Sequence, residues 1–156
     1  MNIVAKKSAD TENRSQSMSM AAATLSEDAL RTLYKMFPGT ARLSVPLGDV
    51  GADLVVEDSS RVVIAEFKTG NPELPLPQST VPQINRVIAR AQSIYPGQEI
   101  VPVVVTNYEV DPSIREALER AGARIVEFEP RKTSTRGLVS NIIREAGLQE
   151  TLASDI

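Results

Sequence analysis

Three side chains that could bind a metal ion and stabilise negative charge lie close together in the sequence: Asp53, Glu66 and Lys68. Carboxylate oxygens are the ligands that hard divalent cations such as Mg²⁺ prefer, and a nearby ammonium group stabilises developing negative charge. The chain has no His and no Cys, which excludes Ser-His-Asp and Cys-His nucleophilic sites, Cys/His zinc sites and internal disulfides. Any chemistry must therefore use carboxylates, Lys, Tyr or hydroxyl groups.

Two predicted strands position these side chains. Residues 42–47, 52–58 and 61–68 are rich in Val, Ile and Leu and are separated by turn residues, which predicts a meander of three strands. A two-residue loop at Ser59 and Ser60 places Asp53 directly across from Glu66. Because successive side chains alternate between faces, Lys68 then shares the face of Glu66. A three-residue loop would instead put the two acids on opposite faces.

The negative charges of the opposed acids Asp53 and Glu66 require a positive charge nearby. Directly opposite side chains have Cβ atoms about 4.5 to 5.5 Å apart, and like charges in that position destabilise a sheet. Lys68 supplies one positive charge, whereas a divalent cation with oxygen ligands accounts for both acids at once. The other face of the same strands carries a predicted core layer: Leu54, Val56, Val63, Ala65 and Phe67.

The remaining elements predict an α/β fold. Ser26 caps a helix with apolar residues at helical spacing, which ends before Pro38-Gly39. A second helix opens at Val81-Pro82, followed by a strand over residues 99–106, a helix over 112–121 and a strand over 123–128. A basic linker, residues 131–136, leads to a last helix. This order predicts a mixed β-sheet with helices on both faces.

Composition predicts one domain, residues 23–148, between a flexible N-terminal tail (1–22) and a C-terminal tail (149–156). With 17 basic and 20 acidic residues the formal charge is −3. This charge and the few aromatic residues argue against a surface that is basic or aromatic throughout, but they allow a local phosphate site. No stretch is apolar enough for a membrane span or signal peptide, so we expect a cytoplasmic protein without a membrane partner.

An Asp on one strand, Glu-x-Lys on the next, and a following helix and strand-helix-strand resemble the PD-(D/E)XK nuclease superfamily, which includes restriction-endonuclease-like and Holliday-junction-resolvase-like enzymes. The resemblance covers about residues 24–130, although Ala52 stands where the family name has Pro. It implies a restriction-endonuclease-like core of order α-β-β-β-α-β-α-β-α. It also implies that Asp53 and Glu66 bind Mg²⁺, with Mn²⁺ as substitute, that the Phe67 carbonyl is a further ligand, and that Lys68 positions or activates the attacking water.

Other charged and polar residues are candidates for the same site, each with a simpler alternative. Glu27 is an additional candidate metal ligand, or it merely favours the start of its helix. Two groups are candidate nucleic-acid contacts, or else solvated helix and linker positions: Gln83, Arg86 and Arg90 on the second helix, and Arg131, Lys132 and Arg136 in the basic linker.

The resemblance predicts a metal-dependent endonuclease or exonuclease that hydrolyses nucleic acid, most plausibly DNA, as a homodimer or within a larger complex. The first alternative is a noncatalytic subunit or interaction module of the same fold in a DNA-processing, defence or phage complex, which the sequence pI of about 5.1 favours. The second is an unrelated α/β protein in which the acid pair is incidental.

Overall fold

A five-stranded sheet forms the centre of the computed structural model, which describes the backbone of residues 3–149 and the side chains of residues 14 and 16–149. The strands lie in sequence order across the sheet. The first three pair antiparallel, whereas the last three pair parallel, so the sheet is mixed as predicted. The strands are β1 (Ala41–Leu47), β2 (Val50–Glu57), β3 (Arg61–Lys68), β4 (Glu99–Thr106) and β5 (Arg124–Glu127).

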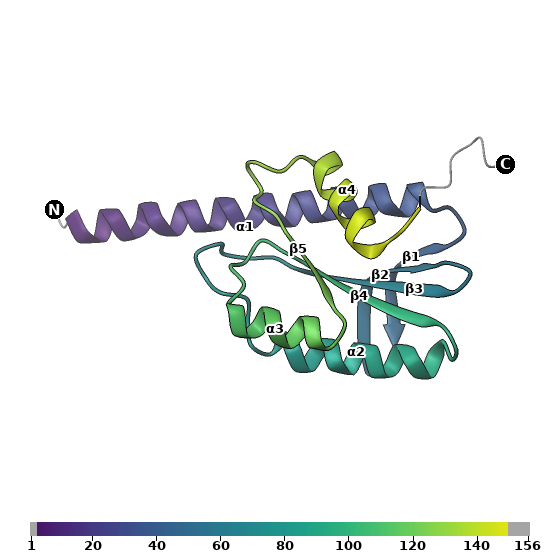
Figure 1. Cartoon of the computed structure of the whole chain (residues 1–156). Helices are drawn as coiled ribbons and strands as arrows, with labels where there is room; N and C mark the ends of the chain where they lie inside the picture. The colour runs from purple at the N-terminus through teal and green to yellow at the C-terminus, as the bar shows by residue number, and fades with distance from the viewer. Residues whose placement is uncertain (1–2, 150–156) are drawn as a thin grey trace.

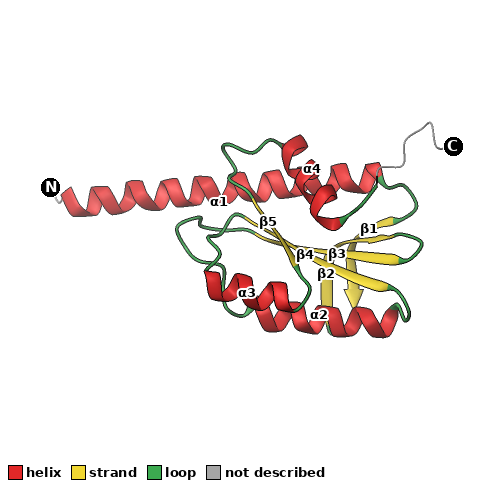
Figure 2. Ribbon diagram, in the orientation of Figure 1, coloured by secondary structure: helices red, strands yellow, loops and turns green. Residues whose placement is uncertain are grey.

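Helices cover both faces of the sheet (Figures 1 and 2). α1 (Ile3–Met36) and α4 (Thr135–Ala146) lie on one face, and α2 (Thr80–Ile94) and α3 (Pro112–Arg120) lie on the other. The predicted α/β class and the predicted order of elements are confirmed. Among the described residues, no helix is both long and apolar enough to span a membrane.

The alternation of apolar side chains along β2 and β3 explains this layering. One set packs against α1 and α4, and the intervening set packs against α2. β4 is buried from Val101 to Thr106 because it lies in the interior of the sheet with helices on both faces. The predicted core layer is confirmed on the α1 side: Leu54, Val56, Val63 and Ala65 are buried, and Phe67 packs against them while partly exposed.

The first helix is longer than predicted. It begins at Ile3 rather than at Ser26, which lies inside the helix and is buried. Alanine is the strongest helix former, but its small side chain gives a weak periodic signal. In the structure the apolar stripe of the helix extends toward the N-terminus beyond Ser26. Its buried residues, which lie in the core shared with α4, are Ala22, Leu25, Ala29 and Leu33. The division into tails and domain stays a prediction, and residues 150–156 lie outside the described residues.

The register between β2 and β3 follows the prediction. Leu54 pairs with Ala65, and Glu57 pairs with Val62. The Asp58 N–H donates to the Arg61 carbonyl at 2.8 Å, which closes a two-residue loop. The three-residue loop that would have separated the two acids onto opposite faces is therefore wrong.

β1 and β2 bend together at one point. Their ladder skips Ser44 and Asp53, which lie between two regular pairs, Leu43 with Leu54 and Val45 with Ala52. Ser44 has a φ of 50°, a left-handed conformation that residues other than Gly rarely adopt. Beyond this point β1 and β2 pack toward α2 instead of α1, since Val45, Leu47 and Ala52 join the α2-side cluster.

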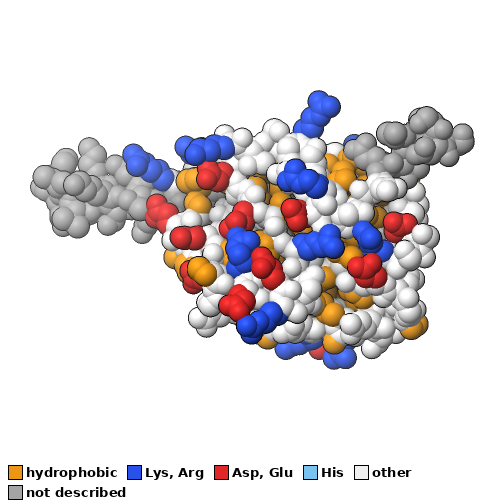
Figure 3. Space-filling model, in the orientation of Figure 1, with side chains coloured by type: hydrophobic (Ala, Val, Ile, Leu, Met, Phe, Trp, Pro, Cys, Tyr) orange, Lys and Arg blue, Asp and Glu red, His pale blue; other side chains and the backbone are white. Residues whose placement is uncertain are grey.

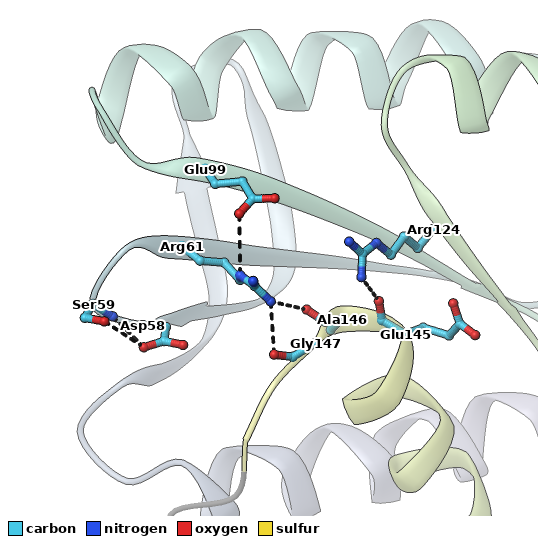
Figure 4. Close-up of polar contacts among 8 residues, drawn as sticks. All are labelled: Asp58, Ser59, Arg61, Glu99, Arg124, Glu145, Ala146 and Gly147. Atoms are coloured by element: carbon cyan, nitrogen blue, oxygen red, sulfur yellow. Dashed lines mark hydrogen bonds and ion pairs between the residues drawn. The ribbon is translucent and has the colours of Figure 1, made fainter.

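Two arginines cap the carboxyl end of α4 (Figure 4). Arg61 at the start of β3 donates to the carbonyl oxygens of Ala146 at 3.4 Å and Gly147 at 3.0 Å. Arg124 of β5 donates to the Glu145 carbonyl. The last carbonyls of a helix lack partners within the helix and carry partial negative charge, so cationic donors stabilise them. These contacts fasten α4 at the end of β3 opposite to Lys68.

Candidate functional site

The carboxylate of Asp53 lies where β2 separates from β3. The regular ladder ends at Leu54 and Ala65, and the alternation of antiparallel pairs would make Ala52 and Phe67 the next hydrogen-bonded pair. Instead, the Phe67 N–H donates to Asp53 Oδ2 at 2.7 Å. Asp53 thus replaces a backbone acceptor and is held against the end of β3, one step beyond the regular ladder.

The same alternation orients the Phe67 carbonyl. In an antiparallel ladder, the N–H and C=O of a hydrogen-bonded residue point to the same neighbouring strand. Because the Phe67 N–H points toward Asp53, its carbonyl faces the gap that β2 leaves. The Phe67 carbonyl therefore points to the same side of β3 as the Asp53 carboxylate.

Glu66 is the most perturbed acid of this region. Its side chain is 6% exposed, and its Oε1 has no hydrogen-bond partner. Burial, and then the negative charge of Asp53, raise the pKa of Glu66 from its ordinary value of 4.5 to about 7, while the ammonium of Lys68 acts in the opposite direction. A buried carboxylate oxygen without a partner is costly unless a cation or proton neutralises it.

Lys68 reaches toward α2. Its Nζ donates to Gln83 Oε1 at 2.6 Å. Ile84, Val87 and Ala91 are buried along the length of α2 and hold the helix on the sheet, which brings the adjacent Gln83 to the end of β3. Asp53, Glu66, Lys68 and Gln83 thus form one cluster, named here the β3-end cluster.

The β3-end cluster fits a hard divalent cation. Two carboxylates and one backbone carbonyl are the oxygen donors that Mg²⁺ accepts, with water completing the shell. The unpartnered Glu66 Oε1 is the observation that favours a ligand here. Among the side chains of residues 14 and 16–149, no group of three or more His, Cys, Asp or Glu residues could hold a metal ion, so the donor set there stops at two carboxylates.

The structure does not bring Glu27 to this cluster. Glu27 lies on α1, which covers the opposite face of the sheet from Gln83. Its side chain is 70% exposed and lies 4.0 Å from Arg31. Glu27 is therefore an exposed acid, and the simpler interpretation, that it favours the start of its helix, is wrong because α1 begins at Ile3.

Arg86 and Arg90 lie one and two turns beyond Gln83 on the same side of α2. The Nε of Arg90 donates to Asp49 Oδ1 in the turn between β1 and β2 at 2.6 Å. This hydrogen bond lowers the pKa of Asp49, and the charge of Arg86 contributes in the same direction. Both arginines therefore lie near the β1–β2 turn, and Arg90, whose side chain is half-exposed, forms an ion pair with Asp49.

The basic linker lies across the sheet from Gln83, beside α1 and α4. Arg131 approaches Ser17 of α1 at 3.5 Å, Lys132 forms an ion pair with Glu129 at 3.2 Å, and Arg136 is exposed in the first turn of α4. Lys132 lines a cavity of about 800 Å³ whose other charged residues are four acids, Glu73, Glu109, Glu127 and Glu129. On the face shown in Figure 3, acidic and basic side chains are interspersed.

Sequence reasoning missed two residues that hold the chain just after Lys68. Asn107 and Tyr108 follow the end of β4 and hydrogen-bond to Gly70 and Thr69. The available signal was a polar pair directly after a buried strand, in a parallel arrangement that brings strand ends together. The strained Ser44 gave no sequence signal, because serine is common in both strands and turns.

The chain was compared with protein-family models, curated proteins and solved structures, and only solved structures match it, over part of their length. No protein-family model matches the chain, and no curated protein matches it. Among solved structures, the crystal structure of a repair endonuclease from Pyrococcus abyssi has a TM-score of 0.46 and 20% identity, over 57% of this chain and 37% of that chain. A crystal structure of a protein of unknown function has a TM-score of 0.47 and 15% identity, over 72% of this chain and 65% of the other. This chain thus spans less than two thirds of either protein.

Proposed function

We propose that the chain is a metal-dependent phosphodiesterase that cleaves nucleic acid, with DNA as the preferred substrate, at the β3-end cluster. The observation that carries the proposal is the buried Glu66, whose Oε1 lacks a partner although Asp53 and Lys68 lie beside it. A buried carboxylate without a partner lowers the stability of the folded chain, and such groups are typical of sites that bind a cation.

Asp53, Glu66 and the Phe67 carbonyl would hold the metal, Mg²⁺ or Mn²⁺. When bound, such an ion polarises a phosphate oxygen and lowers the pKa of water. The Phe67 N–H orients Asp53 toward this position. Lys68 places an ammonium where negative charge develops on the phosphate, and Gln83 holds that ammonium through its amide oxygen.

A second candidate is a noncatalytic module that binds a partner through the same fold. It is favoured by the pairing of basic side chains with acids, Arg90 with Asp49 and Lys132 with Glu129. These pairs reduce the positive field that attracts phosphate backbones. Metal binding separates the two candidates, because only the first requires a cation at Glu66.

Assembly is part of the first proposal. The described residues hold a single β3-end cluster, and cutting both strands of a duplex takes two centres. We therefore propose that the chain acts as a homodimer or within a larger complex.

The test combines titration calorimetry with Mn²⁺ and cleavage of circular duplex DNA in Mg²⁺. The unmodified chain should bind the metal and cut the DNA, and Asp53→Asn and Glu66→Gln should lose both properties while remaining folded. Glu57→Gln is the matched control, since Glu57 lies on β2 at the end remote from the cluster and forms an exposed ion pair with Arg42. Metal binding and cleavage that survive in both cluster variants would overturn the assignment, and absence of metal binding in the unmodified chain would favour the noncatalytic module.

A further inference from the structure

The backbone just after Lys68 is held by a side-chain amide. The parallel ladder of β3 and β4 ends at Lys68 and Thr106, and Asn107 follows directly. The Gly70 N–H donates to Asn107 Oδ1 at 3.0 Å, and Asn107 Nδ2 donates to the Gly70 carbonyl at 2.8 Å. The amide therefore acts as an additional rung of the ladder, made by a side chain where the strands have ended.

Asn107 is suited to this task by its burial. It is 7% exposed and its two hydrogen bonds to Gly70 are partly buried, so a lost partner is not replaced easily by water. A carboxamide is the smallest side chain that offers one donor and one acceptor in the plane required to match a peptide group. Neither aspartate nor alanine can form both bonds.

Tyr108 and Gly70 complete the hold. The Tyr108 hydroxyl donates to the Thr69 carbonyl at 3.2 Å, and the Tyr108 N–H donates to Thr106 Oγ1 at 3.0 Å. A Cβ atom on residue 70 would overlap the Tyr108 hydroxyl. Only glycine therefore allows the chain to approach this closely.

Lys68 is consequently held at both ends. Its backbone precedes the tied residues Thr69 and Gly70, and its Nζ is bound to Gln83 at 2.6 Å. A lysine side chain has many rotamers, so without a fixed backbone its ammonium would move away from Asp53 and Glu66. A small displacement of a charged group from its working position is enough to slow a reaction strongly.

We propose that Asn107 is a positioning residue, which sets the ammonium of Lys68 beside the carboxylates of Asp53 and Glu66 by tying Gly70 to the end of β4. The inference rests on the proposed function for its catalytic consequence. The tie itself rests only on the two hydrogen bonds and the burial of Asn107.

A double-mutant cycle tests the catalytic consequence. Single-turnover cleavage of circular duplex DNA in saturating Mg²⁺ is measured for the unmodified chain, Asn107→Ala, Lys68→Ala and the double variant. Asn107→Ala should slow cleavage by about 10- to 100-fold and leave the Mn²⁺ dissociation constant within about twofold, because Asp53 and Glu66 are untouched. The double variant should be no slower than Lys68→Ala, since Asn107 acts through that lysine. Slowing that multiplies in the double variant overturns the proposal.

Two further variants guard against a general folding effect. Asn107→Asp keeps an acceptor for the Gly70 N–H but loses the donor, and it should reproduce the slowing if Asn107→Ala fails to fold. Asn141→Ala is the matched control, because it removes an asparagine hydrogen bond to Arg144 on α4 and should cleave at the unmodified rate. Equal slowing in Asn141→Ala and Asn107→Asp overturns the positioning role.

Amide hydrogen exchange tests the tie without any activity. In metal-free buffer, the Gly70 amide should exchange at least about tenfold faster in Asn107→Ala than in the unmodified chain, whereas amides of α4 should not change. Unchanged exchange at Gly70 overturns the inference even if the chain cuts DNA. If the unmodified chain does not cut DNA, the proposed function fails, and this measurement still decides whether Asn107 holds the end of β3.

Discussion

Replacing Glu66 with Gln should stabilise the metal-free protein at alkaline pH. Gln has nearly the same shape but no charge, so Glu66→Gln removes the buried, unpartnered carboxylate and keeps the packing. The gain should depend on pH in a defined direction. The pKa of Glu66 is raised in the folded chain to about 7 from 4.5, so the folded state keeps a proton that the unfolded state has released. The stability that Glu66 contributes is therefore complete below about pH 4.5 and is lost as the pH rises through about 7.

The magnitude follows from the size of this shift. At 1.36 kcal/mol per pKa unit, a rise from 4.5 to about 7 corresponds to about 3 kcal/mol of unfolding free energy. Water that reaches the open side of the site reduces this value, so we expect about 1 to 3 kcal/mol. The free energy of unfolding of Glu66→Gln should thus be close to that of the unmodified chain near pH 4, and it should be about 1 to 3 kcal/mol larger near pH 8.

Urea denaturation with EDTA, at about pH 4 and about pH 8, measures the effect. Glu57→Gln is the control, because its exposed side chain should change stability by less than about 0.5 kcal/mol at either pH. Added Mg²⁺ should stabilise the unmodified chain near pH 8 and leave Glu66→Gln unchanged, since metal binding requires the ionised carboxylate. An advantage of Glu66→Gln that is equal at the two pH values would refute the burial argument.

Three further predictions concern other residues. Lys68→Ala should lower single-turnover cleavage by about 10²- to 10³-fold while Mn²⁺ affinity in calorimetry is kept; a loss of metal affinity of the same size would make Lys68 structural. Gly147→Ala should reduce the unfolding free energy by about 1 to 2 kcal/mol, because residue 147 has a φ of 69° and a Cβ there would meet the Arg61 guanidinium. Gly97→Ala, at a φ of 80° with no atom near the added Cβ, should reduce the unfolding free energy by less. If urea curves show that Gly97→Ala loses as much unfolding free energy as Gly147→Ala or more, the proposed clash with Arg61 is wrong. Because Ser44 has a left-handed φ of 50°, Ser44→Gly should stabilise the chain by up to about 1 kcal/mol, and Ser44→Val should destabilise it by more than about 1 kcal/mol. Thermal unfolding measures both, and equal unfolding midpoints for the two variants would contradict the prediction.

Much of the sheet could be predicted because its information is local. Each of these features depends on only a few adjacent residues: the apolar runs of β3 and β4, the turn at Ser59, and the start of α3 at Pro112. Register also follows from local data, since a two-residue loop determines every opposed pair of the hairpin. This is why Asp53, Glu66 and Lys68 could be placed together before the fold was known.

The extent of α1 could not be predicted in this way. Ala22 and Ala29 are buried in a core cluster that α1 shares with the sheet and α4, and α4 lies more than a hundred residues away in the sequence. A helix whose stability comes from such packing has little periodic signal of its own. The separation of Glu27 from the β3-end cluster could not be predicted for a related reason, since the face on which α1 lies is a property of the whole sheet.

The sequence by itself determined the α/β order of elements, because backbone sterics and side-chain alternation act between near neighbours. It predicted the hairpin register and the grouping of two acids with one lysine for a two-residue loop, and the structure contains that loop. Only the tertiary structure decided that Glu66 is buried without a partner, that Gln83 meets Lys68, and that Asn107 ties Gly70. These contacts join segments separated by loops, and their formation depends on how helices and parallel strands pack, which no local pattern encodes.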